Sequence, residues 1–125
     1  MNTKRTFREL ALDIGRRSPC KIQVGAVLSD RKGRVISWGW NHYDDAHKST
    51  VHAEEYAFKR ANPDRIKTGG ITLTVAGSHC NNHTSVYSRP CIGRCLKLVL
   101  KHKIKIIEYT TREGGWEKIT VSSIK

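Results

Sequence analysis

Two separate segments of this chain carry residues that commonly bind metal ions, and each lies where a helix is expected to begin. Residues 50–58 read TVHAEEYAF and set His52 two positions before Glu54. Residues 89–95 read RPCIGRC and contain Cys91 and Cys95. One imidazole and two thiolates suit Zn²⁺, with the carboxylate left free to act as a base. A fold that uses them as one site must bring the two helix starts together.

The rest of the chain alternates between helical and strand patterns. Apolar residues at three- and four-residue steps predict helices over residues 3–15, 50–61 and 91–102. Runs typical of strands cover residues 22–28, 34–40, 71–76, 104–109 and 116–121, with a short returning strand at 85–88. The last two long strands should pair antiparallel, because a parallel crossover needs roughly a dozen residues. This order predicts an α/β fold with a mixed sheet, in a single domain spanning residues 1–125.

Polar segments mark the expected loops. Residues 41–49, NHYDDAHKS, lack periodicity and predict a loop, after which Thr50 would cap the helix that carries His52. Asn62-Pro63 should end that helix, and residues 77–84 predict a turn. His52 and Glu54 would not share a face in mid-helix, but in the first turn both can flank a pocket.

The second segment follows similar logic. Pro90 favours a helix start, and a four-residue step would put Cys91 and Cys95 on one helical face. The positive end of the helix would lower the pKa values of both thiols.

Simpler interpretations of these residues stay open. A lone histidine or cysteine usually serves packing, and a structural zinc would normally be closed by a fourth protein ligand. Cys80, His79 and His83 could replace Cys91 as a ligand, form a second metal site or be ordinary turn residues. Disulfides are disfavoured because the N-terminus lacks a secretory signal pattern.

Charge and hydropathy narrow the range of partners. The formal net charge is +12, from 23 basic and 11 acidic residues, which favours a polyanionic partner or a phosphate-bearing substrate over a merely solvated basic surface. No apolar run approaches the ~20 residues of a membrane span, so no membrane partner is expected. An intracellular, cytoplasmic location is the default expectation.

With these residues in place, the chain resembles the zinc-dependent cytidine/deoxycytidylate deaminase superfamily. H-x-E with P-C-x-x-C is the signature of zinc deaminases, although the cysteines here are spaced C-x-x-x-C. QVGAVLSDRKGRVISWGWN resembles the first hairpin of that family, VHAEEYAF its first zinc helix, and ITLTV its third strand. RPCIGRCLKLVLKHKIKIIEY resembles its second zinc helix and the following strand. The resemblance implies a cytidine-deaminase-like three-layer α/β/α fold with a mixed five-stranded sheet.

The resemblance also assigns roles. His52, Cys91 and Cys95 would bind zinc, and Glu54 would shuttle protons. Asn41 would hydrogen-bond the sugar or base, and the Ala53 N–H would hold the base carbonyl. Val24 and Ser88 are further expected substrate contacts.

Hydrolytic deamination of a cytosine base is the leading functional hypothesis. Zinc would lower the pKa of a water, Glu54 would take its proton, and the hydroxide would attack the ring carbon that carries the amine. A deoxycytidine nucleotide is the favoured substrate, because Arg16, Arg17 and Lys21 lie before the first strand and could meet a phosphate.

Two rival hypotheses remain at this stage. The first is a deaminase acting on cytosine or adenine in single-stranded DNA or RNA. It is supported by the net positive charge and by four aromatic residues that could stack on bases: Trp38, Trp40, Tyr43 and Tyr87. The second is a non-catalytic, zinc-containing nucleic-acid-binding module, against which Glu54 argues. A homo-oligomer is compatible with either.

Overall fold

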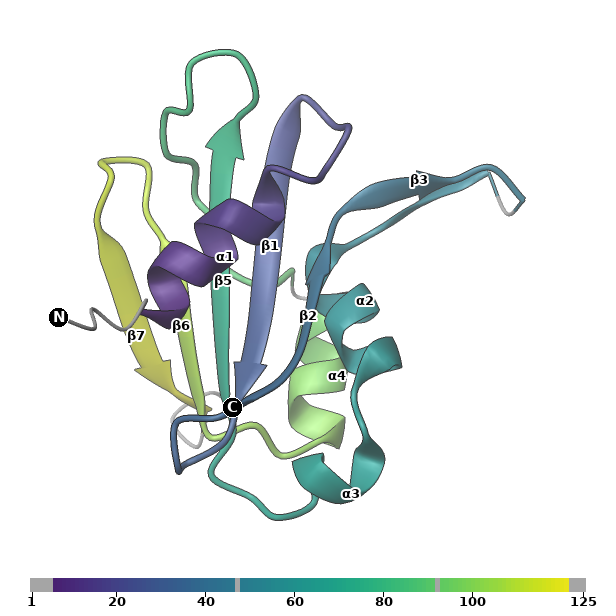
Figure 1. The fold of residues 1–125 in the computed structure, drawn as a ribbon, viewed down its shortest axis with the longest axis vertical. Coiled ribbons are helices and arrows are strands. Elements are labelled where there is room, and N and C mark those ends of the chain that lie inside the picture. The colour runs from purple at the N-terminus through teal and green to yellow at the C-terminus, as the bar shows by residue number, and fades with distance from the viewer. Residues whose placement is uncertain (1–5, 47, 92, 122–125) are drawn as a thin grey trace, which may run out of the picture.

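A five-stranded mixed sheet forms the centre of the protein in the computed structural model, which describes residues 6–46, 48–91 and 93–121 (Figure 1). Its strands lie in the order β2-β1-β5-β6-β7. They are β1 (Ile22–Ser29), β2 (Val35–Trp40), β5 (Thr72–His79), β6 (Ile106–Thr110) and β7 (Trp116–Thr120). Only β5 and β6 run parallel, whereas the other neighbours are antiparallel. The predicted mixed sheet and the antiparallel pairing of its last two strands are both confirmed.

Helix α1 (Phe7–Gly15) covers one face of the sheet. Its buried residues Ala11 and Ile14 pack with Val27 of β1 and Ala76 of β5. Gly25 makes this close approach possible, since a Cβ there would lie 2.0 Å from the Ala11 carbonyl oxygen. Residues 3–5 of the predicted helix lie outside the described part of the chain, in which α1 begins at Phe7.

Helices α2 (Ala53–Arg60) and α4 (Arg94–Lys101) lie on the opposite face, with the short α3 (Pro63–Ile66) between them in the sequence. The main core lies here, where Leu73 and Val75 of the sheet pack with Phe58 and Val99 of the helices. The three-layer α/β/α arrangement expected from the family resemblance is therefore confirmed. The sequence analysis missed α3, which starts at Pro63 directly after the predicted helix end.

The loop predicted for residues 41–49 is wrong. Residues His42–Asp44 form β3 and Ser49–Val51 form β4, an antiparallel hairpin that extends away from the sheet (Figure 1). Thr50 pairs with Tyr43 in this hairpin, so it is not a helix cap. Much of the hairpin is exposed, so no apolar alternation marks it in the sequence. His47 lies outside the described residues.

The segment between β5 and α4 also departs from expectation. Strand β5 continues to His79, through residues expected to form a turn. Residues 85–88 form no regular strand, and only an isolated bridge joins Ser85 to Ser78. Instead, this segment bonds to both parallel strands: the Val86 N–H donates to the Gly77 carbonyl (3.1 Å) and the Ser88 N–H to the Thr110 carbonyl (3.1 Å). Such pairing, which depends on distant residues, leaves no periodic signal.

Candidate active site

His52 lies at the junction between the β3–β4 hairpin and α2. Its backbone is extended (φ −75°, ψ 152°), which makes it the N-cap residue of the helix in place of Thr50. The His52 N–H donates to Oε1 of Glu55 at 2.9 Å, and Glu55, the third residue of the helix, thereby accepts the bond that a capping box requires. The imidazole is thus presented from a fixed helix start.

Cys95 and Cys91 approach from the other segment in different ways. Cys95 lies in the first turn of α4 and is buried, whereas Cys91 precedes the helix, which begins at Arg94 rather than at residue 91. The prediction that both cysteines share a helical face is therefore wrong. The Cys91 carbonyl accepts from the Leu96 N–H (2.9 Å), and the Sγ atom of Cys91 accepts from the Cys95 N–H (3.3 Å). These bonds turn both sulfurs toward the same point. Ile92 lies outside the described residues.

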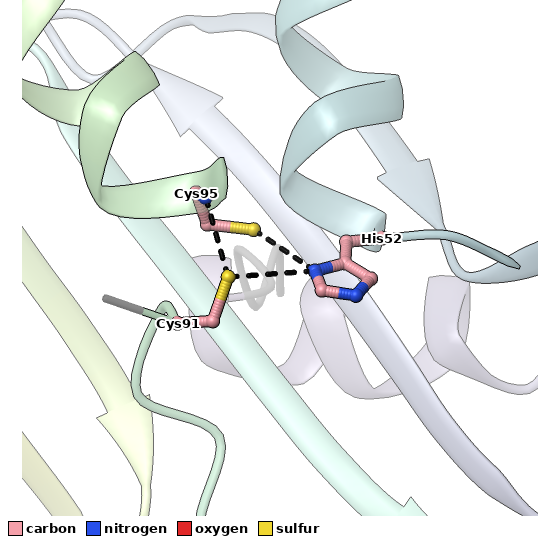
Figure 2. Close-up of side chains that lie close together, drawn as sticks. All are labelled: His52, Cys91 and Cys95. Carbon is pink, nitrogen blue, oxygen red and sulfur yellow. Dashed lines mark hydrogen bonds between the residues drawn. The ribbon is translucent and has the colours of Figure 1, made fainter. Parts of the chain in front are cut away.

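The three predicted ligands form one cluster, here called the ligand cluster (Figure 2). Nδ1 of His52 lies 3.2 Å from Sγ of Cys95 and 3.7 Å from Sγ of Cys91. All three donor atoms lie within 4.8 Å of one another. Zinc binds imidazole nitrogen and thiolate sulfur at about 2.0–2.3 Å, so this donor set fits one ion and leaves a fourth position for water or substrate.

Cys80 does not take part in the ligand cluster. Cys91 is the cysteine whose sulfur faces His52 and Cys95, while Cys80 is exposed in the turn after β5. Among the described residues, no second group of three such side chains comes close enough to hold a metal ion. The alternatives that gave His79 or His83 a ligand role therefore gain no support.

Glu54 lies in the first turn of α2 beside the ligand cluster. Its side chain is buried, with the residue 5% exposed. Burial raises the pKa of Glu54 to about 7, against the opposing effect of hydrogen bonds from its own N–H and from Cys95. A carboxyl group with a pKa near neutrality can both accept and return a proton.

Glu55, its neighbour, experiences the opposite environment. Partial burial acts to raise its pKa, but hydrogen bonds from Arg94 and from the His52 N–H outweigh this and hold the pKa below the ordinary value. Adjacent glutamates with such different pKa values suit different roles, one in proton transfer and one as a fixed anion. The sequence analysis missed both Glu55 and Arg94. The only available signal was an acidic residue in the first turn of one helix and a basic one beside Cys95.

Asn41, an expected substrate contact, is bonded to the backbone at the start of β1. Its Oδ1 accepts from the Val24 N–H and its Nδ2 donates to the Ile22 carbonyl, both at 2.8 Å. A primary amide has two N–H groups and an oxygen with two lone pairs, so each atom retains capacity for a ligand. The backbone at the start of β1 thus fixes the direction in which the amide points.

Ser88 and Val24 converge above Gly77 of β5. A Cβ on Gly77 would lie 3.3 Å from the Ser88 Cβ and 3.8 Å from a Val24 methyl group. The buried Ser88 hydroxyl bonds to Thr110 Oγ1 (2.7 Å) and accepts from the Thr110 N–H (2.9 Å). Its polar contacts are therefore with the protein itself.

Ala53 is buried at the first position of α2, where helical N–H groups have no intrahelical partner.

The three basic residues expected to meet a phosphate lie in the exposed connection from α1 to β1. Arg16 pairs with Asp13 at 3.6 Å, and the Arg17 guanidinium lies 5.4 Å from the centre of the Trp40 ring. Lys21 is exposed, and its carbonyl accepts from the Cys80 N–H at 2.8 Å.

A cavity that the sequence did not reveal opens at the start of β1. It measures about 560 Å³ and is lined by Ile22, His79, Thr84, Ser85, Val86, Tyr87 and Arg112. Of the lining residues, Ile22 accepts a hydrogen bond from Asn41 through its backbone carbonyl, and a methyl group of Val86 would lie 2.6 Å from a Cβ on Gly77. Arg112 gives it a cationic side chain.

Comparisons with solved structures place this fold among deaminases. A cytidine deaminase from Burkholderia pseudomallei is 20% identical with a TM-score of 0.69, covering 92% of this chain and 90% of that one. One from Mycobacterium leprae is 21% identical (TM-score 0.56), covering 94% of both chains. A dCMP deaminase from the cyanophage S-TIM5 is 18% identical (TM-score 0.55), covering 87% of this chain and 86% of that one.

Within the described residues, no helix is both long and apolar enough to cross a membrane.

Comparison of the sequence with known proteins identifies the family. A search of curated proteins found no match. The family model for the cytidine and deoxycytidylate deaminase zinc-binding region, however, matches residues 1–111, which include the whole ligand cluster. The chain therefore belongs to the cytidine and deoxycytidylate deaminase family of zinc-dependent hydrolytic deaminases.

Proposed function

We propose that this enzyme converts a cytosine base to uracil, with a deoxycytidine nucleotide similar to dCMP as its substrate. The observation that carries the proposal is the Glu54 carboxyl group, which is buried beside the three ligand side chains. A structural zinc site does not need such a group, whereas hydrolytic deamination needs a proton carrier at this place.

Each step of the reaction has a residue to serve it. Bound at the ligand cluster, zinc supplies a Lewis acid that makes water more acidic. Glu54 accepts a proton from water as the water oxygen bonds to C4 of the base, and Glu54 passes that proton to N3 of the ring. Glu54 then takes the remaining hydroxyl proton and gives it to the amine as the C–N bond breaks, so that ammonia leaves and a carbonyl forms at C4. The Ala53 N–H and the Asn41 amide would hold the base and sugar during these transfers.

The phosphate of a nucleotide would lie toward the cavity at the start of β1, one of whose lining residues, Ile22, is bonded to Asn41. Arg112 lines this cavity, and Arg16, Arg17 and Lys21 add further positive charge near the start of β1. Guanidinium groups recognise phosphate oxygens with paired hydrogen bonds, which favours a phosphorylated substrate over a bare nucleoside.

Single-stranded nucleic acid is the second candidate substrate. Its support is the net charge of +12 together with three exposed aromatic side chains: Trp38 (36%), Tyr43 (54%) and Tyr87 (55%). Bases stack on such rings without much sequence preference, and the charge would follow the phosphate backbone. Trp38 and Trp40 are weaker stacking candidates than the two tyrosines, because the Arg60 guanidinium lies over both tryptophan rings and that of Arg17 lies over Trp40.

Ammonia release from a matched panel of substrates tests the proposal. Deoxycytidine, dCMP, adenine and guanine nucleotides, and oligonucleotides containing each base should be compared at several salt concentrations. We expect dCMP to react with the highest kcat/KM. Preferential turnover of oligonucleotides, weakened by salt, would instead support the polymer substrate.

Glu54→Gln isolates the chemical step. We expect kcat to fall by at least about 100-fold with the zinc content unchanged, because the amide cannot carry the proton. Normal turnover in this variant would refute the proposed role of Glu54. Inactivity of the zinc-loaded wild type on every substrate would favour the non-catalytic binding module.

A further inference from the structure

The Arg94 side chain connects the two segments that carry the ligand cluster. Its Nε donates to Oε2 of Glu55 at 3.0 Å, and its Nη2 donates to Oε1 of the same carboxylate (Figure 2 shows the helix starts involved). Nη2 also donates to the Thr50 carbonyl in β4, at 2.7 Å. One guanidinium therefore joins the start of α4 to both α2 and the hairpin.

These bonds join the backbone segments that carry His52 and Cys95. Arg94 directly precedes Cys95 in the sequence, and Oε1 of Glu55 accepts the N–H of His52 at 2.9 Å. Each end of the Glu55–Arg94 pair is thus attached to the backbone of a ligand. A paired guanidinium–carboxylate contact fixes both distance and orientation, which a single hydrogen bond does not.

We propose that the Glu55–Arg94 pair is a positioning pair that sets the separation between His52 and Cys95 required by one zinc ion. Groups that bond to ligand-bearing elements typically tune metal affinity in this way. The inference rests on the zinc site and not on the substrate of the proposed function. Arg94 also lies within the three-residue spacer that departs from the P-C-x-x-C signature, so this pair anchors a ligand segment of unusual length.

An ordinary surface ion pair is the alternative, and it makes a different prediction. The Arg94 side chain is 52% exposed, and exposed pairs contribute little to folding stability. If the pair were only a surface contact, its removal would change neither the fold nor the zinc affinity. A positioning pair should leave the fold intact and weaken the metal site.

Competition for zinc distinguishes these outcomes without any substrate. Zinc-loaded wild type, Glu55→Gln and Arg94→Gln would each be titrated with a chromogenic chelator, with the fold checked by circular dichroism. We expect each substitution to weaken zinc binding about 10–100-fold, as the loss of an outer partner typically does. The double variant should be little worse than either single one, because the two side chains act as a unit.

Arg8→Gln provides the matched control. Arg8 Nη2 contacts Glu108 Oε1 at 3.0 Å with the Arg8 side chain 44% exposed, but this pair joins α1 to β6 on the opposite face of the sheet. Its loss should not change zinc affinity. Arg94→Lys keeps the charge but not the paired geometry, so we expect an intermediate affinity.

Cobalt substitution adds a geometric readout, because the visible spectrum of Co²⁺ reports its coordination. We expect Arg94→Gln to shift that spectrum and Arg8→Gln to leave it unchanged. Wild-type zinc affinity and an unchanged cobalt spectrum in folded Arg94→Gln would overturn the proposal. If Arg94→Gln fails to fold, the same criteria apply to Arg94→Lys and Glu55→Gln. Failure of the proposed function would appear separately, as inactivity with normal zinc binding.

Discussion

The two segments that supply the ligand cluster are held in place by different forces. The His52 segment enters a helix that packs backbone against backbone on β2: a Cβ on Gly39 would lie 2.6 Å from both the Ala53 carbonyl oxygen and the Ala57 nitrogen. The segment that leads to Cys91 is irregular between residues 86 and 90, and the hydroxyl of Ser88 ties it to the sheet.

The two kinds of contact differ in how rigidly they hold a ligand side chain. Close packing is intolerant of added atoms, because protein interiors have few voids to absorb them. Hydrogen bonds to a loop hold specific points and leave the chain between them adjustable. The ligand cluster thus combines His52, at the start of a closely packed helix, with Cys91 on an irregular segment and Cys95 buried in the first turn of α4.

Replacing a cysteine in the adjustable segment should have the largest effect. We expect Cys91→Ser to weaken zinc binding by more than the roughly 10–100-fold of a lost outer partner, because a sulfur ligand disappears. Cys80→Ser is the matched control and should bind zinc like the wild type, since Cys80 is exposed outside the ligand cluster. Metal content after dialysis against a chelator measures both. Zinc loss confined to Cys80→Ser would reverse the ligand assignment.

The packed segment should be most sensitive to a single added methyl group. We expect Gly39→Ala to lower the free energy of unfolding by about 3 kcal/mol, near the upper end for overpacking, because backbone atoms block the new Cβ. Zinc affinity should fall with it as α2 shifts. Chemical denaturation at saturating zinc measures the loss.

Gly115→Ala is the control for that substitution. Among the described residues, a Cβ at Gly115 would meet only Thr111 Oγ1 within 4 Å, at an ordinary 3.5 Å, so the stability should change little. Equal stability of the two variants would show that α2 can move away from β2, and the contrast between a rigid and an adjustable segment would then fail.

The same contrast explains which features could be predicted from the sequence. Periodic apolar residues gave the five sheet strands and the helix faces, and His52, Cys91 and Cys95 do come together. The β3–β4 hairpin escaped detection because it packs little apolar surface and therefore shows no alternation. The Cys91 geometry was misjudged because spacing alone cannot distinguish a helical turn from a loop that precedes one.

Electrostatic roles were harder still to predict. The H-x-E signature singled out Glu54, but nothing in the sequence showed that Glu55 would be held as an anion, because its partner Arg94 lies in another segment. The role of Glu55 thus follows from a tertiary contact.

A smaller effect is expected from loosening the adjustable segment at Ser88. Ser88→Ala would remove the hydroxyl that bonds to the Val75 carbonyl (2.9 Å) and accepts from the Thr110 N–H (2.9 Å). A buried donor left without a partner costs about 1–2 kcal/mol, so the unfolding free energy should fall less than in Gly39→Ala. Ser85→Ala loses a bond to the Thr111 carbonyl in a more exposed setting and should cost less again. If Ser88→Ala were as stable as Ser85→Ala, the Ser88 hydroxyl would not be what holds the Cys91 segment, and the loop would owe its position to Pro90 and its backbone bonds instead.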